Sequence, residues 1–175
     1  MILPGLANAF KHGGYEFTKV TPADMKQIRA WMNEPHIIDW WTPEDQEMTV
    51  MEQAEAADSN VVRYMVSYGG RPFAYIQCYD PALDNEYWGD NPQAPGTFGL
   101  DQFIGEAEMI GFGHGTNFIK AFVVELKKQP GVKRIIVDPA PDNGPAIRCY
   151  SQVGFRKEKT ITTPDGPALL MTMTV

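Results

Sequence analysis

The chain has 175 residues, of which 43% are hydrophobic and 21% charged, proportions that are typical of a soluble globular protein. Its formal net charge of −7 argues against a nucleic-acid partner, because such proteins usually present a basic surface. No apolar run is long enough to cross a bilayer and no secretory leader is visible, so we expect a cytoplasmic protein without a membrane partner. The two cysteines and three scattered histidines predict neither a disulfide nor a metal site.

The length of the chain predicts a single domain with an N-terminal extension. We expect residues 1–175 to form a single domain, with residues 1–14 as a flexible N-terminal extension. An alternating pattern predicts a strand over residues 15–20. Thr21 and Pro22 then have the residue types of a helix start.

Further elements follow in chain order. Residues 47–58 predict a second helix, and residues 63–68 and 72–79 predict a hairpin around two glycines. Residues 80–96 contain three prolines and four acids, which is typical of a long functional loop. The remaining predicted elements are strand 97–104, helix 115–129, strand 134–137, helix 143–153 and a closing hairpin of 160–163 with 168–175. This order predicts an α/β (α+β) fold with a mixed sheet.

The segment from Asp101 to Thr116 carries the clearest chemical signal. A predicted strand runs into alternating glycines at 111–115, and a predicted helix follows. Glycines let the backbone curl so that its N–H groups converge on an anion, and a helix start adds further N–H groups and its dipole. With Asn143 and Tyr150 later in the chain, this pattern indicates an enzyme that holds a phosphate-bearing cofactor beside a carboxylate.

Five motifs carry a family resemblance that spans most of the chain after residue 20. They are WMNEPHIIDWW at 31–41, GLDQFIG at 99–105, GFGHGT at 111–116, VDPAPDNGPAIRCYSQVGF at 137–155 and TTPDGPALLM at 162–171. With them the chain resembles the Gcn5-related acetyltransferase superfamily, and within it the aminoglycoside 6'-N-acetyltransferases. The resemblance implies a largely antiparallel mixed sheet flanked by helices, with a splayed strand pair that holds acetyl-CoA. It also implies a small cationic amine as the acceptor, and we expect a monomer or a homodimer.

The resemblance implies roles for particular residues. Asp101 matches the proposed general base, although a role in binding the charged amine fits it equally well, and Tyr150 matches the general acid. A backbone N–H near Phe103 is expected to face the thioester oxygen. The residues expected to bind the cofactor are Phe103, Gly111, Phe112, Gly113, His114, Gly115, Thr116, Asn143, Ala146 and Tyr150. Ile110 departs from the superfamily pattern, because Gln or Arg is frequent at its position.

Acceptor binding is expected to use acids and tryptophans. The residues that match the family are Trp41, Asp84, Trp88, Asp101, Asp138 and Asp165. Carboxylates pair with ammonium groups, and aromatic faces stack on sugar rings or cations. Some of these residues also have a purely structural alternative: a tryptophan can belong to the core, Asp84 can lie in a solvated loop, and Asp165 can form a turn. In the loop of residues 80–96, Asn85 or Glu86 can contact the acceptor in place of Asp84.

The motifs favour one function over two alternatives. The first and favoured function is acetylation of the 6'-amine of an aminoglycoside. The second is acetylation of a siderophore precursor of the hydroxylysine type or of another small biogenic amine. The third is a non-catalytic acyl-CoA-binding protein.

Overall fold

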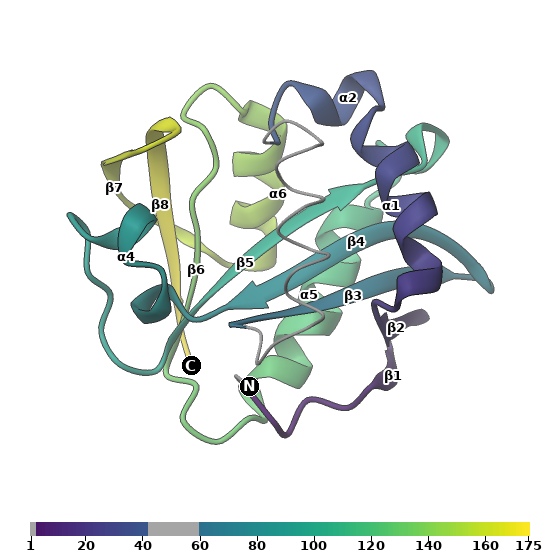
Figure 1. Ribbon diagram of the computed structural model, residues 1–175, viewed down its shortest axis with the longest axis horizontal. Coiled ribbons are helices and arrows are strands. Elements are labelled where there is room, and N and C mark those ends of the chain that lie inside the picture. Colours follow the sequence, from purple (N-terminus) through teal and green to yellow (C-terminus); the bar gives the residue numbers. More distant parts are fainter. Residues whose placement is uncertain (1–2, 42–59) are drawn as a thin grey trace.

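The computed structural model describes residues 3–41 and 60–175, which form an eight-stranded sheet covered by helices (Figure 1). The strand order is β1-β2-β3-β4-β5-β6-β8-β7, and every neighbouring pair is antiparallel except β5 and β6. The strands are β1 (Ala9–His12), β2 (Tyr15–Lys19), β3 (Val61–Tyr68), β4 (Arg71–Tyr79), β5 (Thr97–Ile104), β6 (Arg134–Val137), β7 (Arg156–Thr163) and β8 (Gly166–Thr174). This confirms the predicted mixed, largely antiparallel sheet.

The helices vary from single turns to almost four turns. They are α1 (Met25–Met32), α2 (Pro35–Ile38), α4 (Asn85–Trp88), α5 (His114–Lys127) and α6 (Gly144–Val153), with 3-10 turns η1 (Pro22–Asp24), η2 (Pro81–Leu83) and η3 (Ala107–Met109). The helix predicted at 47–58 lies outside the described residues. Within the described ranges, no helix has the length and apolar content needed to cross a membrane.

The N-terminal region departs from the expectation of a flexible extension. Residues 9–12 form the edge strand β1, which pairs with β2 around a turn at Gly13 and Gly14. Leu3 and Leu6 are buried in the main core. The alternation in this short strand is too brief to stand out in the sequence, and its apolar residues become informative only once β2 lies beside them.

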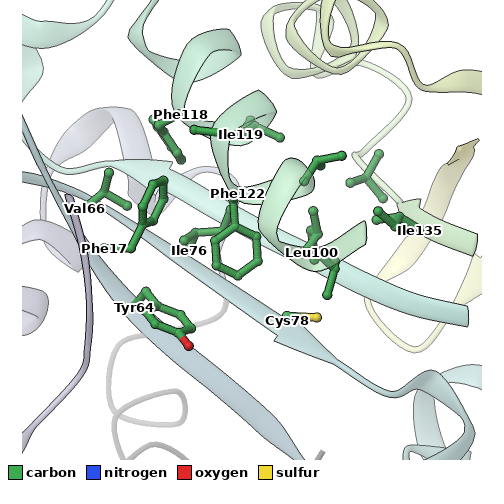
Figure 2. Packing of buried hydrophobic residues seen from close by; sticks show 14 of the residues in the cluster. Phe17, Tyr64, Val66, Ile76, Cys78, Leu100, Phe118, Ile119, Phe122 and Ile135 are labelled. Carbon is green, nitrogen blue, oxygen red and sulfur yellow. The ribbon is translucent and has the colours of Figure 1, made fainter. Parts of the chain in front are cut away.

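Two hydrophobic layers hold the sheet, one on each face. Helices α5 and α6 cover one face, and Figure 2 shows Phe118, Ile119 and Phe122 of α5 directed onto strand side chains such as Ile76 and Leu100. Helices α1 and α2 cover the other face over a smaller cluster, whose buried members are Ile28, Trp31, Met32, Ile37, Met65, Tyr75 and Phe103. Strand β5 contributes to both layers, because successive side chains of a strand point to opposite faces.

Strands β5 and β6 separate soon after they pair. Their parallel register joins Thr97 to Arg134, Phe98 to Ile135 and Gly99 to Ile136, and it stops there. Strand β5 continues for five more residues to Ile104, and in Figure 1 it runs away from β6 toward the upper right. The sheet therefore splays at its centre, as the family resemblance implied, and the candidate site lies at this opening.

Candidate active site

A cavity of about 1400 Å³ lies where β5 leaves β6, and most of the predicted site residues line it. Those that line it are Trp41, Asp84, Trp88, Asp101, Phe103, Gly111, Gly113, Gly115, Thr116, Asp138, Asn143, Ala146, Tyr150 and Asp165. The volume exceeds the range of about 300–1,000 Å³ that suits one small ligand. The cavity thus has room for two reactants side by side.

The glycine loop builds one end of the cavity from backbone. Gly111 and Gly113 have φ angles of +87° and +82°, which disfavour any residue with a Cβ atom. Helix α5 begins directly after Gly113, so its first N–H groups have no partners within the helix. A Cβ atom on Gly111 would meet no atom within 4 Å, so the loop leaves open space in front of its backbone. This arrangement fits a phosphate group.

Phe112 and His114, two residues of this loop that were expected to bind the cofactor, do not line the cavity with their side chains. Phe112 is 75% exposed and lies outside it. The His114 ring packs on the edge of β2 and β3, where its Nδ1 lies 2.9 Å from the Tyr15 hydroxyl oxygen and its ring lies 4.8 Å from that of Tyr68. Both side chains therefore lie away from the cavity, Phe112 in solvent and His114 against the sheet. Only the backbone N–H groups of Phe112 and His114 remain candidates for binding a phosphate, whereas the Ile110 side chain does line the cavity.

Helix α6 brings two of the predicted residues to the opening. Asn143 caps the helix, since its Oδ1 accepts a hydrogen bond of 3.2 Å from the Ala146 N–H. Tyr150 is buried two turns later, and burial raises the pKa of its hydroxyl well above the ordinary value, partly offset by a hydrogen bond with Gln102. Tyr150 is therefore protonated at neutral pH and can donate a hydrogen bond.

Asp101 lies on the other face of β5, and strand β4 fixes its carboxylate. The register of the sheet places it opposite Gln77, whose Nε2 donates to Asp101 Oδ2 at 2.8 Å. The Gln77 Oε1 accepts a bond of 2.7 Å from the Tyr75 hydroxyl. Asp101 and Tyr150 thus approach the opening from opposite faces of the sheet.

The backbone of β5 indicates which N–H groups near Phe103 face the opening. Gly105 N–H donates to Phe73 O at 2.8 Å, on the β4 side of the strand. Hydrogen bonds in an antiparallel pair alternate, so the N–H of Phe103 also points toward β4. The groups that point toward the opening are those of Gln102 and Ile104. One N–H adjacent to Phe103, not its own, is thus the candidate donor.

Asp138 follows β6 and forms the acidic part of the acceptor end. Its Oδ2 accepts a hydrogen bond of 2.5 Å from the Tyr87 hydroxyl of α4. Burial, and then the nearby charge of Asp101, raise the pKa of Asp138 to about 7, although the bond from Tyr87 opposes the rise. Two neighbouring carboxylates, Asp101 and Asp138, therefore share the cavity. Because like charges repel, ionising both at once costs free energy unless a cation is bound.

The two tryptophans that were expected to bind the acceptor differ in how much of the side chain can contact a ligand. Trp41 lines the cavity and packs edge-on against Phe103, with ring centroids 5.0 Å apart. Trp88 also lines it, yet it is only 2% exposed and packs as core against Ile136 and its neighbours. It is therefore a supporting residue more than a stacking surface.

The two outer acids are exposed and reach the cavity from turns. Asp84 accepts a hydrogen bond of 3.1 Å from the Tyr87 N–H and so caps α4. Asp165 lies in the turn between β7 and β8. Asp84 lines the cavity whereas Asn85 and Glu86 do not, and Asp80 of the same loop lines it as well.

Sequence reasoning did not single out Tyr75, Gln77 and Gln102, whose side chains make hydrogen bonds in or behind the site. A glutamine in the buried part of a largely apolar strand was the available signal, because buried polar groups need hydrogen-bond partners. Nothing in the sequence places Tyr87 beside Asp138, 51 residues later.

Comparison with known proteins agrees with this geometry. A family profile described as "Acetyltransferase (GNAT) domain" matches residues 21–163. The chain is 35% identical over 161 residues to aminoglycoside N(6')-acetyltransferase type 1 of Klebsiella pneumoniae, covering 89% of this chain and 80% of that protein. It is 42% identical over 92 residues to a kanamycin resistance protein of Rhizobium radiobacter, covering 53% of this chain and 85% of that protein.

Solved structures show the same architecture. The structure of AAC(6')-Ib in complex with coenzyme A and kanamycin superposes with a TM-score of 0.79 at 34% identity, covering 91% of this chain and 94% of that one. The same protein with ribostamycin and coenzyme A gives a TM-score of 0.80 at 33% identity, covering 92% and 93%. The splayed strands, the glycine loop and these matches lead to one conclusion: the chain belongs to the GNAT acetyltransferase family.

Proposed function

We propose that this chain transfers the acetyl group of acetyl-CoA to the 6'-amine of an aminoglycoside. The observation that carries the proposal is the convergence of carboxylates from four separate segments on one cavity that also contains a phosphate-type loop. The acids that line it are Asp80 and Asp84 of one loop, Asp101, Asp138 and Asp165. A site with this many acids suits an acceptor with several ammonium groups. The relatives named for aminoglycoside 6'-acetylation support this choice of acceptor.

The loop end of the cavity would hold the coenzyme. The backbone N–H groups of residues 111–116 and the start of α5 suit its pyrophosphate. The edge of β5 offers the N–H groups of Gln102 and Ile104 to the pantetheine arm and to the thioester oxygen. Acetyl-CoA would supply an activated acetyl group. Because it is a cytoplasmic metabolite, we place the reaction in the cytoplasm.

Asp101 would act on the amine. A lysine-like amine has a pKa of about 10.4, so presenting its neutral form at pH 7 costs roughly 4–5 kcal/mol. Asp101 can hold the ammonium group and take its proton directly or through water. General base assistance of this kind is worth about 10²–10⁴-fold in rate.

Tyr150 would act on the departing sulfur. Its raised pKa makes complete proton transfer to a thiolate unfavourable, since a thiol has an ordinary pKa of about 8.5. A hydrogen bond from the Tyr150 hydroxyl can still stabilise the negative sulfur without losing its proton. The role supported by the burial of Tyr150 is therefore that of a hydrogen-bond donor to the leaving group.

The test is release of free thiol from acetyl-CoA with a panel of amines. Kanamycin and tobramycin represent 6'-amines, an aminoglycoside with a 6'-hydroxyl is the negative control, and hydroxylysine, spermidine and a lysine peptide represent other acceptors. We expect saturable turnover with the 6'-amines alone. Asp165→Asn should raise KM for them, whereas Asp142→Asn, an exposed acid outside the cavity, should not.

Other outcomes would redirect the proposal. Turnover with hydroxylysine or spermidine only would keep the acetyl transfer and assign the acceptor to the second function. Binding of acetyl-CoA without turnover of any amine in the panel would contradict the proposal and favour a non-catalytic role.

A further inference from the structure

Two buried polar residues of β4 lie behind Asp101 and have no role in the reaction outlined above. The Tyr75 hydroxyl donates to Gln77 Oε1 at 2.7 Å, and Gln77 Nε2 donates to Asp101 Oδ2 at 2.8 Å. Tyr75 and Gln77 are two residues apart and so share one face of β4. The three side chains form a continuous row of hydrogen bonds from the core to the cavity.

The direction of this row is determined by its two ends. An ionised carboxylate can only accept hydrogen bonds, so the amide group must turn its NH₂ toward Asp101. Its oxygen then faces Tyr75, whose hydroxyl supplies the matching donor. The opposite amide orientation would place Gln77 Oε1 against Asp101 Oδ2, two acceptors in contact.

Packing holds the first member of the row in one position. Tyr75 is fully buried, its ring stacks on that of Phe103 at 5.1 Å, and Trp41 meets it edge-on at 6.0 Å. Gln77 is only 9% exposed. Burying a glutamine and a tyrosine hydroxyl costs free energy that a phenylalanine and an apolar residue would avoid, so their presence calls for a function.

We propose that Tyr75 and Gln77 are positioning residues, which hold the carboxylate plane of Asp101 in the orientation that receives the substrate amine. Tyr75 orients the Gln77 amide, and Gln77 fixes Asp101 Oδ2 and with it the position of Oδ1. The inference rests on the proposed function, because it assigns Asp101 to the amine. It adds that acetyl transfer requires the Asp101 carboxylate to be held in one orientation by side chains of β4.

Other ionisable groups near Asp101 do not replace this row. They include Cys78, Tyr79, Tyr87, Asp138 and Tyr150, which interact with it electrostatically, and Arg63 of β3, which pairs in register with Gln77 and lines the same cavity. Burial raises the pKa of the thiol and of the three hydroxyls, so these four stay neutral at pH 7. Asp138 is the member of this group that can compete with Asp101 for a proton, so every variant is also measured in an Asp138→Asn background.

The experiment compares Gln77→Met, Tyr75→Phe and the double variant with wild type. We expect kcat for the preferred amine to fall about 10- to 100-fold in Gln77→Met, the range for losing a hydrogen bond to a charged group, with KM for acetyl-CoA unchanged. Tyr75→Phe should lower kcat about 2- to 10-fold. The double variant should be no slower than Gln77→Met, because both changes break one row.

The control is Tyr64→Phe on the neighbouring strand β3. Tyr64 is also fully buried, and its hydroxyl donates to Ala7 O at 2.8 Å on the opposite face of the sheet. It should lose stability like Tyr75→Phe and keep the kinetics of wild type. If Tyr75→Phe behaves in the same way as this control, the positioning role is wrong and the row is merely structural.

A second readout separates this inference from the proposed function. The ¹³C signal of the Asp101 carboxyl, followed by NMR without substrate, should titrate about one pH unit higher in Gln77→Met, because the variant lacks a donor to the ionised form. An unmoved titration together with unchanged kcat overturns the positioning pair even if aminoglycosides are acetylated. A moved titration with no turnover of any amine supports the pair and rejects the proposed function.

Discussion

The two ends of the cavity are built in different ways. The loop end consists of the backbone of residues 111–116 and the start of α5, one continuous stretch of chain. The acceptor end consists of side chains from β4, β5, α4 and the residue after β6, joined by single hydrogen bonds. Backbone groups survive most substitutions, whereas each side-chain bond is lost with one. We therefore expect changes at the acceptor end to affect turnover and pH dependence, and changes at the loop to affect coenzyme affinity.

The largest expected effect is at Asp101. Asp101→Asn keeps the size of the side chain and removes the base, so we expect kcat for the amine to fall about 10²- to 10⁴-fold. Because the loop end is separate, the affinity for acetyl-CoA, measured by calorimetry, should stay within about twofold of wild type. A variant that turns over at the wild-type rate would remove Asp101 from the chemistry and blur the distinction between the ends.

The next effect concerns pH and Asp138. Its pKa of about 7 in the folded protein exceeds the ordinary value of 3.8, so between these pH values the folded state binds a proton that the unfolded state has lost. The free energy of unfolding should therefore fall as pH rises from about 4 to 7, by at most ~4 kcal/mol, and then level off. Urea unfolding measured across this range checks the slope.

The Asp138→Asn variant should lack most of this slope, whereas Asp90→Asn, an exposed acid, should keep it. A cationic acceptor favours the ionised form of Asp138, so its affinity should rise as pH passes 7. An equal slope in wild type and Asp138→Asn would mean that other groups carry the pH dependence.

A smaller effect is expected at Tyr150. Tyr150→Phe removes the hydroxyl and keeps the ring in its buried position, so kcat should fall about 10- to 100-fold if the hydroxyl stabilises the leaving sulfur. Single-turnover measurements with acetyl-CoA in excess separate this step from product release. An unchanged rate in this experiment would indicate that water, and not Tyr150, donates the hydrogen bond to the leaving sulfur.

The smallest effect is expected in the loop. Gly113→Ala places a Cβ atom on a residue with a φ of +82°, which costs about 1–2 kcal/mol of stability. Gly69→Ala, at a φ of +58° in the hairpin far from the cavity, provides a control with the same kind of strain. Both should lower the melting temperature, and only Gly113→Ala should weaken coenzyme A binding, by about tenfold. Equal binding in the two variants would show that the loop geometry is not what holds the coenzyme.

The same contrast explains what could be predicted from sequence. The strand at 97–104 and the one at 134–137 were predicted with their observed bounds, because each is a short segment rich in β-forming residues next to clear turn residues. The glycine loop and the start of the helix at Asn143 are local patterns, so they too were visible. A local pattern needs no knowledge of the fold.

The features that were missed all depend on pairing between distant segments. The hydrogen bond from Tyr87 to Asp138 and that from Gln77 to Asp101 join residues 51 and 24 positions apart. Strand β1 became recognisable only beside β2. The orientation of the Phe112 and His114 side chains away from the cavity depends on backbone angles that the alternating glycines permit but do not specify. The roles of the site residues in catalysis stay predictions until the variants are measured.

The short pairing between β5 and β6 has a thermodynamic consequence. Beyond Gly99, strand β5 has N–H and C=O groups that face an opening where a neighbouring strand would normally lie. A ligand that bonds to Gln102 and Ile104 takes the place of this strand and completes the sheet. Such a ligand binds only the folded chain, and at 100 times its Kd it adds about 2.7 kcal/mol to stability. The free energy of unfolding is then highest when this ligand is bound.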